Sequence, residues 1–307
     1  MRRIKYFFKA IRQAGIEFNN DNGLKLSASL SYYTIFALAP LIIIIISLTG
    51  IFFGRAAIQG KIYTEISGLV GSNAGLQIQQ IVANIQQTKH NTAGTMIGIL
   101  ILVIAATGIF TEIQGSINYI WAVKPKPKRG LLKIIINRLL SFSLLVSTGF
   151  LLMVSLISSS LMDLLSDHLK VYFADSTVYI FYAINIIIIF LITALLFAVI
   201  FRILPDATIK WKDTFTGALF TSFLFLLGKF FIGLYVSKSN IGYTYGAAAS
   251  IIAILLWVYY SSVILYFGAE FTRTWAIYYG RGITPNDTAV FIIKQEAKEI
   301  GTSSFDE

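Results

Sequence analysis

The uncharged stretch between Lys25 and Arg55 constrains the fold of this chain more than any other feature. As an α-helix, the segment from Leu30 to Phe53 reaches about 36 Å, which is enough to cross the apolar core of a bilayer with some tilt. A soluble helix of this length carries a polar stripe, but the second half of this stretch has almost no polar residue. The stretch therefore predicts a membrane-spanning helix.

The composition of the whole chain supports a membrane protein. Apolar residues make up 56% of the 307 residues, charged residues make up 13%, and the mean hydropathy is +0.73. These values are far from those of a soluble domain and typical of a chain that crosses the membrane several times. The chain has no cysteine, which excludes disulfides and thiolate metal sites.

Successive long apolar segments predict the fold class, an all-α integral membrane protein with six transmembrane helices. We expect the spans at about residues 30–53, 94–118, 139–161, 178–201, 214–236 and 247–269. They form a membrane domain of residues 23–270.

Three further segments are predicted around these spans. Residues 1–22 have the pattern of a basic amphipathic helix that lies on the cytoplasmic membrane surface. Residues 271–307 predict a polar cytoplasmic tail. The loop that follows the first span predicts two short amphipathic helices outside the cytoplasm, because apolar residues recur there at helical spacing.

The distribution of lysine and arginine predicts the orientation in the membrane. Nineteen of these residues lie at the termini and in the loops on one side of the predicted spans, and five lie in the alternate loops. Because cytoplasmic loops carry the excess of Lys and Arg, both termini are expected in the cytoplasm. The net charge of +10 is therefore explained by topology and by contact with anionic lipid headgroups, and we expect no nucleic-acid partner.

Several short motifs occur in an order that resembles a known family. They are Leu30 to Leu41 (LSYYTIFALAPL), Asn118 to Trp121 (NYIW), Leu204-Pro205 with Trp211 and Gly217-Ala218, Tyr245-Gly246, Trp257, and Gly268-Ala269-Glu270. Together they resemble the YihY/BrkB family of bacterial inner-membrane proteins, over roughly residues 15 to 280. The resemblance implies six spanning helices in the inner membrane and no settled biochemical activity. Members of that family are linked to serum resistance, and transport of lipid-related molecules has been proposed for them.

An older label of that family, ribonuclease BN, does not fit the residues of this chain. Metal-dependent hydrolysis needs a cluster of histidine and carboxylate ligands that holds the ion and activates its water. The sequence has only His90 and His168, both in predicted outer loops. We therefore predict no catalytic residue, no metal site and no cofactor, and we expect the protein not to be an enzyme.

Glu112 is the most informative candidate for a pathway or substrate contact. It shares a helical stripe with the small residues Gly108 and Gly115, and Trp121 is expected to mark the cytoplasmic interface. Glu112 would then lie about 13 Å inside that interface, where an ionisable group is costly and suggests a path for protons or substrate. Alternatively, the apolar core ends near Thr111 and Glu112 lies at the boundary. Asn118 extends the same polar region.

Two further charged residues, Lys229 and Glu270, each allow two interpretations. Lys229 lies within the fifth predicted span, where it either faces an internal cavity as an anion contact or snorkels to the outer surface. Glu270 ends the sixth predicted span with Arg273 three residues later, which suits a local ion pair at the membrane surface. The alternative for Glu270 is a substrate contact.

The first span contributes hydroxyl groups and a proline. Ser31 and Thr34 lie on one face of its first half, and Pro40 interrupts its hydrogen bonding in mid-span. These residues either line a cavity next to a hinge at Pro40, or the hydroxyls satisfy backbone carbonyls near the kink.

Two functions remain open at this point. The first is a transporter or permease for a lipid or envelope component of unknown substrate, and the second is a non-transporting membrane scaffold or envelope-integrity protein. A continuous polar cavity that contains Glu112 or Lys229 favours transport. Side chains that point to lipid or solvent around a solid core favour the scaffold. Membrane lipids are the expected partners, and the sequence leaves open a homo-oligomer.

Overall fold

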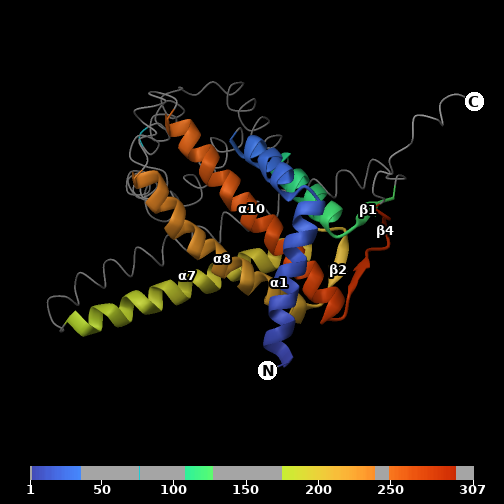
Figure 1. The fold of residues 1–307 in the computed structure, drawn as a ribbon, viewed down its shortest axis with the longest axis horizontal. Coiled ribbons are helices and arrows are strands. Elements are labelled where there is room, and N and C mark those ends of the chain that lie inside the picture. The colour runs from blue at the N-terminus through green and yellow to red at the C-terminus, as the bar shows by residue number, and fades with distance from the viewer. Residues whose placement is uncertain (1, 36–75, 77–107, 127–174, 239–248, 295–307) are drawn as a thin grey trace, which may run out of the picture.

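Three long apolar helices dominate the part of the chain that the structure describes. The structure is a computed structural model, and it describes residues 2–35, 76, 108–126, 175–238 and 249–294. The helices are α7 (Asp175–Ile203), α8 (Trp211–Lys238) and α10 (Ala249–Tyr278). Helix α7 packs on α8, and α8 packs on α10 (Figure 1).

Each of these helices contains a segment that is long and apolar enough to cross a membrane. The segments are Ala183–Ile203, Trp211–Phe231 and Ile254–Tyr278. They overlap the fourth, fifth and sixth predicted spans. Of the other three predicted spans, residues 30–53 and 94–118 are described only at one end, and residues 139–161 lie outside the described residues. Pro40 also lies outside them, as do the predicted amphipathic helices of the first outer loop apart from the helical Leu76.

The crossing of α8 and α10 depends on two glycines that face two threonines. A Cβ placed at Gly217 on α8 would lie 1.9 Å from Oγ1 of Thr272 on α10, and a Cβ at Gly268 on α10 would lie 2.0 Å from Oγ1 of Thr221 on α8. Each threonine hydroxyl donates to a carbonyl of its own helix, four residues earlier, at 2.6–2.7 Å. The helices therefore approach closely without leaving these buried hydroxyls unsatisfied.

Helix α10 continues beyond its predicted end. The sixth span was expected to stop at residue 269, but the helix runs to Tyr278 because one face of its last two turns is buried against the rest of the protein. Phe271 is fully buried against Phe7 and Phe220, and Ala276 is also fully buried. Glu270 consequently lies well inside the helix.

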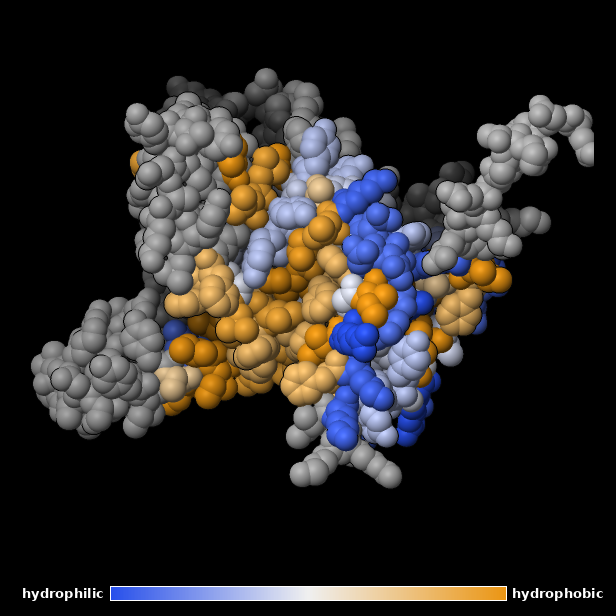
Figure 2. Space-filling view, viewed as in Figure 1, coloured by the Kyte–Doolittle hydropathy of each residue, from blue (hydrophilic) through white to orange (hydrophobic). Residues whose placement is uncertain are grey.

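Helix α1 (Arg2–Asn20) uses its apolar face for packing against protein. Ala10 and Ala14 are buried in a cluster with Phe220 of α8 and Phe271 of α10. The sequence predicts this face to lie on the membrane surface; in the structure its Phe7 and Ile11 pack on the cluster, whereas Phe8 is 64% exposed. Figure 2 shows the hydrophilic residues of α1 as a band beside the apolar surface of the long helices. After a turn at Asn22, which has a φ of 53°, a second helix spans residues 23–35.

Two small antiparallel sheets lie at one end of the helices, and the all-α prediction missed them. Strand β1 (Val123–Pro125) pairs with β4 (Ala289–Phe291), and β2 (Ala207–Ile209) pairs with β3 (Ile283–Pro285) (Figure 1). Each strand has three residues, too few for an alternating pattern to be recognised in a sequence. The pairing joins the segment after α10 to two loops that lie far earlier in the chain.

A helix at residues 108–120 leads into β1 and packs on α10. Trp121, which directly follows it, was expected to mark the membrane interface. The structure instead buries its side chain to 1% exposure, and its indole Nε1 donates to the carbonyl of Ala269 at 3.1 Å. Trp211 is half exposed, with the guanidinium of Arg202 5.6 Å from the centre of its ring, as suits an interface residue.

The glycine contacts at the α8–α10 crossing yield a first prediction. Gly217→Ala and Gly268→Ala should each lower the free energy of unfolding by about 1–3 kcal/mol, because the added methyl group meets a β-branched side chain that packing holds in place. Thermal unfolding of the purified protein in detergent measures the change. Gly115→Ala is the matched control, since a Cβ at that helical glycine meets no atom within 4 Å. Equal stability of all three variants would contradict a close glycine contact.

Candidate functional site

A row of polar side chains runs along the inner face of α10. Ser262, Tyr266 and Glu270 are spaced four residues apart, so they lie on one face of the helix. Their exposures are 3%, 0% and 0%. Over eight residues the row extends about 12 Å along the axis. Polar groups buried on an otherwise apolar helix are unusual enough to mark a candidate site.

Glu270 is the most unusual member of this row. Both of its carboxyl oxygens are buried, and among the described residues neither forms a hydrogen bond of ordinary geometry, although Asp21 lies close enough for the two carboxyl groups to share a proton. Its nearest cation is Arg273, whose Nη1 lies 3.8 Å from Oε2 of Glu270 and 3.9 Å from Oε2 of Glu17. The ion pair that the spacing of Glu270 and Arg273 predicted is therefore present, but the carboxylate is fully buried. A buried carboxylate whose nearest cation lies 3.8 Å away is only partly compensated for the loss of its water.

Asp21 brings a second buried carboxylate to the same place. It lies in the turn after α1, is 3% exposed, and is the acidic neighbour of Glu270. The ammonium of Lys294 pairs with Oδ2 of Asp21. The same ammonium donates to the carbonyl of Ile120 at 3.3 Å and lies 4.5 Å from the centre of the Tyr119 ring.

These five residues form what we call the charge cluster: Glu17, Asp21, Glu270, Arg273 and Lys294. It joins α1, α10 and the segment after β4. The sequence analysis identified only Glu270 and its pairing with Arg273. Asp21 occurs in a turn motif with Asn22 and Gly23, where an acidic residue is ordinary. Lys294 lies 273 residues further along the chain, and no spacing rule connects two such positions.

Glu112 faces the polar row from helix 108–120. It is half-buried, and one turn further along the helix Ser116 is 4% exposed. Glu112 and Ser116 are the polar neighbours of the Tyr266 hydroxyl, which forms no hydrogen bond of ordinary geometry within the described part of the chain. Glu112 therefore lies on the side of helix 108–120 that is turned toward Tyr266, and its depth in the membrane, on which the two interpretations of the sequence differ, stays a prediction.

Asn118 fastens helix 108–120 to the turn after α7. Its Nδ2 donates to Oδ2 of Asp206 at 2.8 Å, and its Oδ1 accepts from the backbone N–H of Asp206 at 2.8 Å. Gln114 adds a contact from Nε2 to the same carboxylate at 3.2 Å. Both polar atoms of the Asn118 side chain are thus occupied in holding the turn that follows Pro205.

The remaining candidates lie apart from the polar row. Lys229 is exposed on α8 and is followed by Phe230 and Phe231, which are 62% and 60% exposed. Ser31 and Thr34 donate to backbone carbonyls of their own helix, to Ala28 and Leu30 respectively, both at 2.8 Å. These hydroxyls thus satisfy backbone groups, as one of the two interpretations of the first span holds.

The charge cluster holds its carboxylates with protein cations. Within the described ranges, no group of three His, Cys, Asp or Glu side chains is arranged to hold a metal ion. Arg273 and Lys294 instead link carboxylates from different segments. A carboxylate in this cluster can accept a further hydrogen bond from an incoming donor, because it has more lone pairs than its present contacts use. An arginine or lysine of the cluster can then move to another anion.

Comparisons with known proteins agree with a membrane protein. The chain matches the profile of the family described as "Virulence factor BrkB" over residues 15–289. It is 28% identical over 260 residues to a UPF0761 membrane protein of Saccharophagus degradans, covering 85% of this chain and 58% of that relative. It is 27% identical over 275 residues to a UPF0761 membrane protein of Ralstonia nicotianae, covering 86% of this chain and 57% of the relative.

A third relative is closer in length. The UPF0761 membrane protein of Pseudoalteromonas atlantica is 26% identical over 271 residues, which cover 88% of this chain and 87% of the relative. The chain thus spans less than three fifths of the length of the first two relatives. No solved structure matches the chain.

The pairing of Lys294 with Asp21 yields the second prediction. Lys294→Met should lower the free energy of unfolding by about 2 kcal/mol, because it leaves the buried Asp21 carboxylate without its cation. The loss is smaller than for a fully buried pair, because the lysine is partly exposed to water. Thermal unfolding in detergent measures this loss. Adding Asp21→Asn to the variant should recover part of the stability. Lys126→Met serves as control, since the contact of that ammonium with the carbonyl of Asp287 is exposed. A loss as large in the control would show that the buried pair is not special.

Proposed function

Because this chain belongs to the BrkB family of membrane proteins, we propose that it is a permease that moves a lipid or another envelope component across the inner membrane of a bacterium. The proposed protein has six transmembrane helices and both termini in the cytoplasm. Transport involves no enzymatic step, no nucleic acid and no cofactor. The run of apolar segments and the basic loops on one side support this topology.

The observation that carries the proposal is the burial of the Glu270 carboxyl group, which forms no hydrogen bond of ordinary geometry among the described residues. Ionisable groups inside membrane helices are costly, and they mark pathways for substrates, ions or protons more often than they serve stability. Glu270 lies in a row with Tyr266 and Ser262, so polar groups continue from the charge cluster along the inner face of α10. Glu112 adds a second carboxylate on the facing helix.

In this proposal the charge cluster is the cytoplasmic entrance and the polar row is the path. A charged substrate group that reaches Glu270 meets Arg273, which already divides its contacts between Glu270 and Glu17 at similar distances. Arg273 is therefore placed to release a carboxylate and to bind an anionic group instead. The Tyr266 hydroxyl, which has no well-formed hydrogen bond within the described part of the chain, can take over the next contact.

A non-transporting scaffold is the competing function, and two observations favour it. Asn118 uses all of its side-chain polar atoms to hold Asp206, and Lys229 is exposed among exposed phenylalanines on α8. Both residues are then structural or lipid-facing. If the protein is a scaffold, the polar row makes the packing of the helices specific, and no molecule passes along it.

The third prediction separates the two functions. Glu270→Gln and Glu112→Gln should change the amount or identity of lipids that co-purify with the protein, because each removes an acidic group from the proposed path. A charge-assisted hydrogen bond is worth about 1.5–3 kcal/mol, so its loss corresponds to about tenfold or more in the occupancy of a specific ligand. Mass spectrometry of the lipids bound to purified protein measures the change.

Asp287→Asn is the matched control, because it makes the same acid-to-amide change at an exposed turn. Gln has nearly the same size as Glu, and Arg273 keeps Glu17 as a partner in the Glu270 variant, so the purified variants should unfold at temperatures close to that of the unaltered protein. Identical bound lipids in all variants, at equal stability, would reject the path and favour the scaffold.

A further inference from the structure

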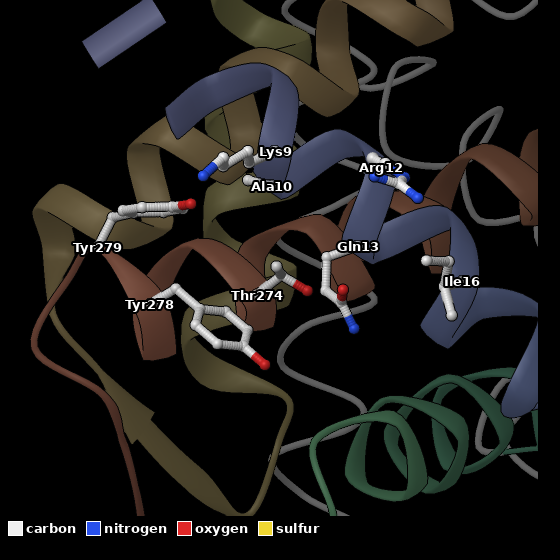
Figure 3. A pocket seen from close by; sticks show the side chains of 8 residues that line it. All are labelled: Lys9, Ala10, Arg12, Gln13, Ile16, Thr274, Tyr278 and Tyr279. Carbon is white, nitrogen blue, oxygen red and sulfur yellow. The ribbon is translucent and has the colours of Figure 1, made fainter. Parts of the chain in front are cut away.

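A groove lies between α1 and the end of α10, away from the polar row. It encloses about 360 Å³. Lys9, Arg12 and Gln13 line it from α1, and Thr274, Tyr278 and Tyr279 line it from the other side (Figure 3). The two walls belong to segments that pack through the buried cluster of Ala10, Ala14 and Phe271, so the groove is a fixed part of the fold.

The charges that line the groove are both positive. Lys9 and Arg12 are its charged residues, they are three positions apart on α1, and both are exposed. Neither forms an ion pair with any residue that the structure describes. The nearby acid Glu17 is already engaged, because it accepts from Gln13 at 2.7 Å and pairs with Arg273 at 3.9 Å. The groove therefore presents two unneutralised cations.

Neutral donors lie between and beside these cations. Figure 3 shows Lys9 and Tyr279 at one end of the groove, Arg12 at the other, and Thr274 and Gln13 between them. The Tyr279 ring is held by stacking on Tyr6, with ring centroids 4.8 Å apart. Hydroxyl donors on a rigid wall beside two cations form a surface that suits the several oxygens of a phosphate group.

Exposed apolar side chains occur on the two helices that form this groove. Ile16, which lines the groove, is 44% exposed, and Phe8 of α1 and Ile277 of α10, each next in the chain to a lining residue, are 64% and 50% exposed. The groove lies where the apolar segment Ile254–Tyr278 ends, at the level where headgroups meet acyl chains if that segment spans the membrane. A soluble phosphate makes no favourable contact with these apolar side chains. A lipid can bind the cations through its phosphate and the apolar rim through its acyl chains.

We propose that this groove binds the phosphate of an anionic phospholipid, with the acyl chains against the apolar rim. Lys9 and Arg12 neutralise the phosphate, and the hydroxyls of Tyr278 and Tyr279 donate to its oxygens. Ile16 and Ile277 contact the chains. The site holds its lipid whether or not the protein transports anything, so it does not rest on the proposed permease function.

The fourth prediction tests this site with the full chain in detergent. Native mass spectrometry should show retention of added phosphatidylglycerol in preference to phosphatidylcholine with the same acyl chains. Lys9→Gln combined with Arg12→Gln should weaken this retention by about 25-fold, since each cation near a headgroup contributes about fivefold. Lys5→Gln combined with Lys25→Gln is the matched control. It removes the same charge at exposed positions that do not line the groove.

Two further arms identify the ligand. Millimolar inorganic phosphate should not displace phosphatidylglycerol, because it gains nothing from the apolar rim; full displacement would show a site for a soluble anion and overturn the lipid assignment. Tyr278→Phe should reduce retention with no change in charge. Equal retention of the two lipids, or an equal loss in both double variants, would show that binding depends on overall charge and not on this groove.

Discussion

The close crossing of α8 and α10 is the contact on which the rest of the described structure depends. Gly217 and Gly268 allow the two backbones to approach, and the row of residues on α10 that faces α8 includes Tyr260, Ile264, Gly268 and Thr272. Residues two positions further along a helix point to nearly the opposite side, because each residue turns by about 100°. The polar row of Ser262, Tyr266 and Glu270 is therefore directed away from α8. A third row with Phe271 and Trp275 receives α1.

This arrangement explains why Glu270 is buried without being used in the packing of the long helices. Helix 108–120 and the turn at Asp21 cover the polar row, and the side chain that this turn brings to Glu270 is a second carboxyl group. The charge cluster compensates part of the cost through Arg273 and Lys294, which come from α10 itself and from the segment after β4. Buried ion pairs contribute little to stability when compared with apolar contacts of the same size. The cluster is thus better explained by a role in binding or by specificity of assembly than by stability alone.

Helix α1 connects the two candidate sites. Its apolar side packs on α8 and α10, its end supplies Glu17 and Asp21 to the charge cluster, and its exposed side supplies Lys9 and Arg12 to the groove. A lipid bound in the groove would contact α1, the helix whose Glu17 shares Arg273 with Glu270. The two sites are nevertheless separate in their chemistry, because the groove presents cations and the polar row presents carboxyl and hydroxyl groups.

The sequence by itself determined the class of protein, three of the long helices and the family. Uninterrupted apolar segments leave few alternatives to a helix in a membrane, and the positions of α7, α8 and α10 follow directly from them. The motifs with Gly217 and Gly268 were recognisable, although their reason, a close helix crossing, was not. Only the tertiary structure decided that Trp121 is buried, that α10 continues past Glu270, and that three-residue strands join distant loops. It also decided that Asp21 and Lys294 meet. Contacts between residues far apart in the chain depend on how the helices pack in three dimensions. The periodicity of one helix predicts which face is buried, but it does not predict which residue lies opposite.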